Sequence, residues 1–198
     1  LTVCEHGINP RFMLTMARRA MTQANAEAQR RSEGKAAFQK MSRGVRVLSR
    51  LMMPPELLGR LSPRSHPDAE SPPDVVFYTG CNMLKTPHIG LLCLDVLERL
   101  GVTYAVEGGP GACCGILQGR AGDTDNAGRQ AFTTLDKFVG TKASEVVSWC
   151  PTCQIQFGET VIPSYQKVTG HSVDMSMFPV YLASRLDALR PHMTTTVN

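Results

Sequence analysis

Residues 75–81 read VVFYTGC, a short run of β-branched and aromatic residues that reaches a cysteine through Thr79 and Gly80. The run predicts a strand over 75–78. Two further strands are expected at VTYAV (102–106) and EVVSW (145–149), with helical periodicity between the strands at 86–100 and 124–139. This alternating series predicts an α/β fold with a small, mostly parallel sheet and flanking helices.

Cysteines follow each of the three expected strands. Cys81 follows the first strand, Cys113 and Cys114 follow the second, and Cys150 and Cys153 follow the third. Ligand sites of open α/β sheets gather at the carboxyl ends of the strands, so these five thiols are expected to meet at one edge. Their spacing is C-x31-CC-x35-C-x2-C.

The adjacent cysteines lie in the glycine-rich loop GGPGACCGILQG at 108–119. Successive side chains of an extended strand point to opposite faces, so neighbouring thiols serve one centre only if the backbone bends. Glycine permits that bend because it reaches φ > 0, and we expect Gly115 to turn the chain away at once. For this loop taken alone, a surface turn with two incidental thiols stays the alternative.

Seven cysteines without a secretory signal indicate metal or redox chemistry rather than a disulfide framework. Mononuclear zinc takes four ligands, and adjacent cysteines fit poorly on one tetrahedron. In an iron–sulfur cluster, neighbouring thiolates can reach neighbouring irons, so five thiolates fit such a cluster better. The CPTC sequence at 150–153 would start a helix, a setting that favours thiolates. Zinc stays open as the alternative, whereas a thioredoxin-like dithiol does not require the other three cysteines.

Three short motifs carry a family resemblance. FYTGC at 77–81, ACCGI at 112–116 and WCPTC at 149–153 resemble the cysteine-rich CCG domain of heterodisulfide reductase and related iron–sulfur oxidoreductases. These relatives include the iron–sulfur subunits of glycolate oxidase and of lactate utilisation. The resemblance covers residues 74–190 and agrees with the family in three separated elements.

The resemblance implies a cofactor and a function. It implies that the five motif cysteines hold a non-cubane [4Fe-4S] cluster, and that the chain is an oxidoreductase subunit of a heterodisulfide-reductase-like complex. Electrons would pass to or from a thiol, a disulfide or a redox partner such as a ferredoxin-like or flavin subunit. The heterodisulfide reductase subunit with this domain carries two such modules and this chain carries one, so a complete two-cluster site is not expected here. The alternative is a zinc-binding structural or docking module.

The chain is expected to divide into four segments. Residues 1–60 form a helical N-terminal arm with helices at 11–31 and 33–53, residues 61–73 a linker, residues 74–190 the CCG domain, and residues 191–198 a tail. The arm is basic and too small to build its own core, so we expect it to pack on another subunit or on a missing cluster domain.

The start of the chain faintly resembles the end of a ferredoxin-type cluster motif. Only Cys4 is present there, and Pro10 is displaced from the place directly after it. A ligand role for Cys4 and a residue without a metal role both stay open, as does a truncated N-terminus, since the chain begins with Leu1.

The remaining candidates are weaker. Cys93 lies on the apolar face of an expected helix and is expected in the core. Of the histidines, His88 is near enough to Cys81 to be considered as a proton carrier, while His171 and His192 lack ligand spacing. Trp149 would shield the cluster or fill the core.

Charge and hydropathy restrict the kinds of partner and the cellular location that we expect. The net charge of +4 accompanies no nucleic-acid-binding motif, so no nucleic-acid partner is expected. No run of residues is long and apolar enough for a transmembrane helix, and no signal peptide is recognisable. We therefore expect a cytoplasmic protein.

Overall fold

The computed structural model describes residues 8–23, 27–62 and 71–193. Its centre is a four-stranded sheet in the order β2-β1-β3-β4, formed by Tyr104–Gly108, Val75–Gly80, Glu145–Ser148 and Met175–Met177. Every pair of neighbouring strands is parallel. The expected α/β class is confirmed, together with the three expected strands, and β4 is an addition that the sequence did not suggest.

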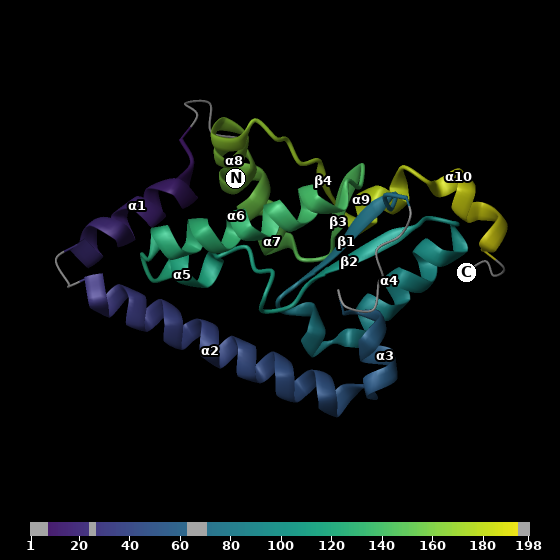
Figure 1. Cartoon of the computed structure of the whole chain (residues 1–198), viewed down its shortest axis with the longest axis horizontal. Coiled ribbons are helices and arrows are strands. Elements are labelled where there is room, and N and C mark those ends of the chain that lie inside the picture. Colours follow the sequence, from purple (N-terminus) through teal and green to yellow (C-terminus); the bar gives the residue numbers. More distant parts are fainter. Residues whose placement is uncertain (1–7, 24–26, 63–70, 194–198) are drawn as a thin grey trace.

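Helices cover both faces of the sheet (Figure 1). Val75 and Phe77 point to one face, where they pack with α4 (Pro87–Arg99) and α9 (Phe178–Ala183). Val76 and Tyr78 point to the other face, against α6 (Thr124–Thr141). Since strand residues alternate between faces, the fully buried β1 divides the interior into two apolar cores.

Short helices complete the connections. Two of them, η2 (Met83–Lys85) and α5 (Ile116–Arg120), follow the ends of β1 and β2, and α7 (Pro151–Gln156) follows β3. The chain ends its described part with α10 (Leu186–Leu189) and η4 (Arg190–His192).

A wide turn interrupts the long helical segment after β3. The π-helical turn η3 (Phe157–Val161) joins α7 to α8 (Ile162–Thr169). Pro163 has no N–H to donate to the carbonyl four residues earlier, and the Ile162 N–H bonds instead to Phe157 O, five residues back. The turn leaves Phe157 fully buried against the sheet.

The N-terminal region is helical, as expected, but its helices do not divide at the predicted residue. The helices are α1 (Pro10–Gln23), α2 (Glu27–Met52) and α3 (Pro55–Arg60). The predicted break at residue 32 is wrong, because α2 continues through Ser32 and Gly34. Gly34 is a weak helix former, yet a Cβ there would lie 3.4 Å from the Gln118 Cα, so glycine allows the close approach of α2 to α5.

The long helix α2 packs on the module that follows it. It lies along α5 and η2, the short helices next to the ends of β2 and β1, and it buries Val45 (Figure 1). The Arg11 guanidinium on α1 forms an ion pair with Glu159 at 3.1 Å. One face of the arm therefore packs on this chain itself.

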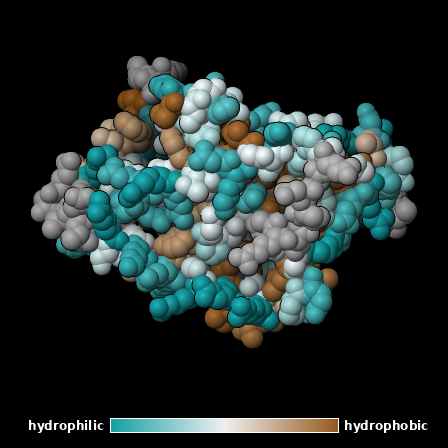
Figure 2. Space-filling view, viewed as in Figure 1, coloured by the Kyte–Doolittle hydropathy of each residue, from teal (hydrophilic) through white to brown (hydrophobic). Residues whose placement is uncertain are grey.

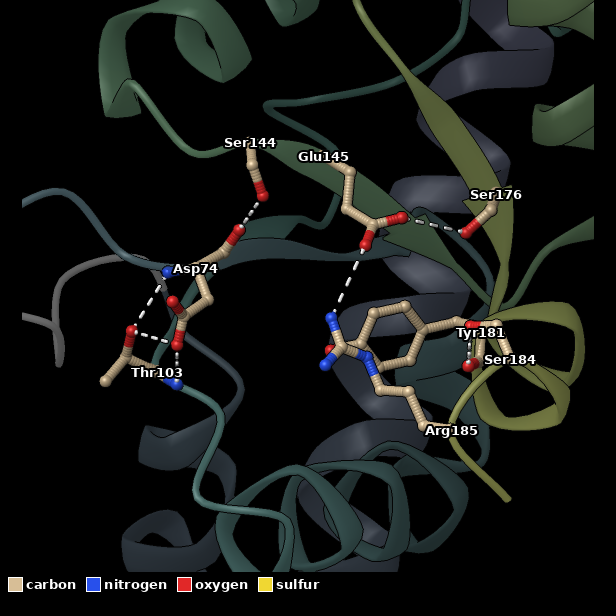
Figure 3. A network of polar contacts seen from close by, with 8 residues as sticks. All are labelled: Asp74, Thr103, Ser144, Glu145, Ser176, Tyr181, Ser184 and Arg185. Atoms are coloured by element: carbon tan, nitrogen blue, oxygen red, sulfur yellow. Dashed lines mark hydrogen bonds and ion pairs between the residues drawn. The ribbon is translucent and has the colours of Figure 1, made fainter. Parts of the chain in front are cut away.

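Polar contacts fasten the sheet at its amino-terminal edge (Figure 3). The Asp74 carboxylate accepts hydrogen bonds from the Thr103 N–H and hydroxyl, each at 2.7 Å. Ser144 Oγ donates to Asp74 O at 2.6 Å, and Arg185 approaches the Glu145 carboxylate at 4.0 Å. These contacts join the starts of β1, β2 and β3. Within the described ranges, every helix is too short or too polar to cross a lipid bilayer.

Candidate metal centre

The five motif cysteines meet at the carboxyl edge of the sheet. Cys81 follows β1 directly, Cys113 and Cys114 lie between β2 and α5, Cys150 lies between β3 and α7, and Cys153 is in the first turn of α7. The Cys153 thiol donates to Cys114 Sγ at 3.6 Å. The convergence expected from the spacing is therefore present in the structure.

The thiols form a row in which each one interacts with the next. Side-chain interactions connect the thiols in the order Cys81, Cys113, Cys114, Cys153 and Cys150, and the contact of Cys153 with Cys114 is a hydrogen bond. All are free thiols, and all except the half-exposed Cys150 are buried. In the described part of the chain, no three Cys, His, Asp or Glu side chains already surround one ion position.

Two thiols in the row are biased toward the thiolate. Hydrogen bonds from Cys113 and Cys153 hold the pKa of Cys114 well below its usual range, despite its burial. The thiols that donate in these contacts lose acidity. The hydrogen bond to Cys114 raises the pKa of Cys113 to about 11, and the bonds to Cys114 and Cys150 raise the pKa of Cys153 strongly. For Cys81, the contact with Cys113 and burial both raise the pKa.

The start of α7 lowers the pKa of Cys150. Its value is about 6, first because of the Cys153 thiol and then because of backbone N–H groups of Cys153 and Thr152, while burial opposes the shift. Pro151 occupies the first helical position, where its missing N–H costs no intrahelical bond. The expectation that CPTC begins a helix and favours a thiolate is confirmed for Cys150.

Gly115 bends the chain after the adjacent cysteines. It has φ +76° and precedes α5, and a Cβ at this position would overlap the Ala127 carbonyl oxygen of α6. The expected positive φ is confirmed, and the close neighbour is the backbone of α6. Thr134 on the same helix donates to Cys113 O at 3.1 Å, which holds the loop from behind.

Gly80 leaves room beside the thiols. It has φ +63°, and a Cβ there would lie 3.4 Å from Cys153 Sγ and 3.5 Å from Cys150 Cβ. A side chain at this position would fill the space between β1 and the CPTC turn. A row of five thiols beside a backbone without a Cβ suits a thiolate-bound metal cluster.

Tyr78 is a neighbour of the thiols that the sequence patterns did not reveal. Its hydroxyl donates to Ala112 O at 3.0 Å and lies 3.9 Å from Cys153 Sγ. Its ring is fully buried with edge contacts to Phe138 and Phe157. Burial and the surrounding thiols raise its pKa. The sequence could have indicated this residue, because Tyr78 lies three residues before Cys81 in a strand that ends at the site.

Two other sequence candidates, Cys93 and Trp149, belong to the core on the opposite face of the sheet. Cys93 is buried in the core on the opposite face of the sheet, as expected, and burial raises its pKa to about 12. Trp149 is half-buried and packs on Phe178 in that same core. The imidazole of His88 is exposed, and Cys4 lies outside the described residues.

Comparison with known proteins gives one family. Residues 75–158 match the model of the CCG family, a cysteine-rich domain. The matched range begins at β1, ends within η3 and includes all five cysteines of the row. No curated protein and no solved structure gave a significant match to the chain.

Proposed function

Residues 75–158 are a cysteine-rich domain of the CCG family, and on this premise we propose that the five clustered cysteines bind an iron–sulfur cluster in an electron-transferring oxidoreductase subunit. The proposed ligands are Cys81, Cys113, Cys114, Cys150 and Cys153. The proposed cofactor is a non-cubane [4Fe-4S] cluster, and the proposed context is a heterodisulfide-reductase-like complex. Residues 74–190 would be the module that carries the cluster.

The row of thiols is the observation that carries this proposal. Two thiolates bound at about 2.3 Å to one tetrahedral metal lie about 3.8 Å apart, close to the 3.6 Å between Cys114 and Cys153. The remaining thiols extend the row on both sides, which suits several metal ions better than one. A bound iron–sulfur cluster would supply electron transfer at this edge of the sheet.

The protein's own residues would define access to the site. Cys113, Cys114 and Cys153, in the middle of the row, are at most 2% exposed, so this part of the row is closed to water. Cys150, at one end of the row, is half-exposed. Burial and hydrogen bonds at the sulfurs tune the potential of such centres, and electrons would enter or leave most readily beside Cys150.

A partner surface is proposed on α2. Its second half exposes the apolar side chains of Val47, Leu48 and Leu51. Figure 2 shows brown side chains gathered along the lower edge of the molecule, over this part of α2. Apolar patches of this kind mark interaction sites, and a redox partner subunit is the proposed occupant.

Anaerobic redox chemistry of the full chain tests the function. The iron-loaded protein should take up electrons from dithionite with a change in visible absorbance and EPR, and should then reduce an aromatic disulfide that releases coloured thiols. The reaction is RSSR + 2e⁻ + 2H⁺ → 2RSH. Cys93→Ser is the matched control and should behave as wild type. A chain that holds zinc and accepts no electrons would contradict the proposal and support a structural module.

A further inference from the structure

Glu107 presents an unexplained carboxyl group beside the thiols. It lies on β2, next to the glycines that begin the cysteine loop, and its side chain is half-buried. One carboxyl oxygen, Oε2, is inaccessible to solvent and has no hydrogen-bond partner. A buried acceptor without a partner is costly and rare in folded proteins, so a function is expected for it.

The sheet register places Glu107 next to Tyr78. The two residues are partners in the parallel pairing of β1 and β2, and partners in register point to the same face. Tyr104 and Val106 belong to the core of the α4 face, so Glu107 points to the α6 face together with Tyr78. The Tyr78 hydroxyl lies 3.9 Å from Cys153 Sγ. Glu107 is thus the strand neighbour of the residue whose hydroxyl reaches the thiols.

From the described elements packed on β2, the Lys137 ammonium of α6 is the charged group that acts on the Glu107 carboxyl. Tyr78 is the register partner of Glu107 on β1, and its hydroxyl bonds to Ala112 O. Lys137 is exposed, and its Nζ donates to Gly111 O at 3.2 Å, within the cysteine loop. Removal of the carboxyl from water raises the pKa of Glu107, and the attraction to Lys137 opposes the rise. Burial is the larger of the two effects, so the carboxyl retains its proton to higher pH than an exposed glutamate.

We propose that Glu107 stores a proton in the folded protein and supplies it to the cysteine edge when a disulfide is reduced there. This inference rests on the proposed function. Cleavage of a disulfide by two electrons from the redox partner yields two thiolates. Glu107 transfers its proton to one of them, giving a thiol and a carboxylate, and the second proton comes from solvent. The carboxylate is stabilised by Lys137 and regains a proton through its exposed side.

The protonation state is tested on the full chain without turnover. Infrared difference spectra between a pH at which exposed carboxyl groups are already ionised and a more alkaline pH should show a carboxylic-acid carbonyl band in wild type. The band should be absent in Glu107→Gln and present in Glu56→Gln, a control at an exposed glutamate of α3. Retention of the band in Glu107→Gln would overturn the stored proton, as would its absence in wild type.

The pH profile of disulfide reduction tests proton supply. Wild-type kcat should fall as pH rises and deprotonates Glu107. Glu107→Gln should be about tenfold or more slower at low pH with an unchanged KM, and should lose this pH dependence. Glu107→Asp retains an acid at the position and should recover part of the rate, which separates proton supply from a folding defect.

The outcomes distinguish the inference from the proposed function. If wild type reduces the disulfide and Glu107→Gln shows the same pH profile, proton supply by Glu107 is overturned and the proposed function stands. No disulfide reduction by iron-loaded wild type would overturn the proposed reaction, and proton supply with it.

Discussion

At the scale of single residues, replacing different cysteines should have different effects on the metal content of the protein. Serine at Cys113 or Cys114 should remove or convert the cluster, because a serine oxygen is a harder and less easily ionised ligand than thiolate. Cys93→Ser should keep the metal and lose only packing stability, since Cys93 lies in the opposite core. Iron and sulfide analysis of the three variants checks this, and equal iron in all of them would exclude the assignment.

Gly115 offers a second test at this scale. Gly115→Ala should lower both the cluster content and the melting temperature, since φ +76° is strained for alanine by about 1–3 kcal/mol and the new Cβ meets Ala127 O. Gly115→Val should be worse, because a β-branched residue fits a positive φ poorly. Gly111→Ala is the control in the same loop, where a Cβ meets nothing within 4 Å. Equal metal content and melting in all three variants would contradict this interpretation.

The sequence was informative for some residues and not for others. The roles of the cysteines and of Gly115 could be predicted, because strand ends and glycine conformations are local properties of the chain. The proposed role of Glu107 could not be predicted from the sequence. It depends on strand pairing with Tyr78 and on Lys137, which is 30 residues further along the chain. Contacts between distant segments have no local signal.

At the scale of elements, the predicted and observed boundaries differ where packing overrides local preference. Met175–Met177 contains no β-branched residue, yet it forms β4 because the edge of β3 offers backbone partners. The helix α2 likewise passes through Gly34, where an isolated helix would be weak, because close contact with α5 compensates.

Gly34 therefore gives a prediction for α2. Gly34→Leu should force α2 away from α5 and destabilise the protein by about 1–3 kcal/mol, as for other overpacked positions. Ala37→Leu, at an exposed position one turn later on the same helix, should be nearly neutral. Denaturant unfolding and limited proteolysis of α2 measure the difference. Similar stability of both variants would mean that α2 is not held through this contact.

At the scale of the whole molecule, one edge of the sheet contributes to stability and the other edge carries the proposed metal ligands. The amino-terminal edge carries the contacts of Asp74 and Glu145 (Figure 3). The carboxyl edge carries the thiols. Parallel strands impose this division because their ends of one kind lie together. Stability and metal binding should consequently respond to different substitutions.

Asp74→Ala tests this separation. Hydrogen bonds from Thr103 lower the pKa of Asp74, so the carboxylate stabilises the fold above the pKa of the unfolded chain and stops doing so as pH falls through the folded value. The variant should lose about 1 kcal/mol or less at neutral pH, since the site is exposed. Its deficit relative to wild type should vanish in acid, while the iron content per folded chain stays unchanged. Unfolding curves across pH with metal analysis check both parts, and a loss of iron would contradict the separation.

Metal and sulfide analysis of the full chain, purified without oxygen, tests the central claim most directly. Five clustered thiols in a domain that matches the CCG family predict iron and acid-labile sulfide in equal amounts, with no zinc. Zinc without sulfide would contradict an iron–sulfur centre and with it the electron-transfer function.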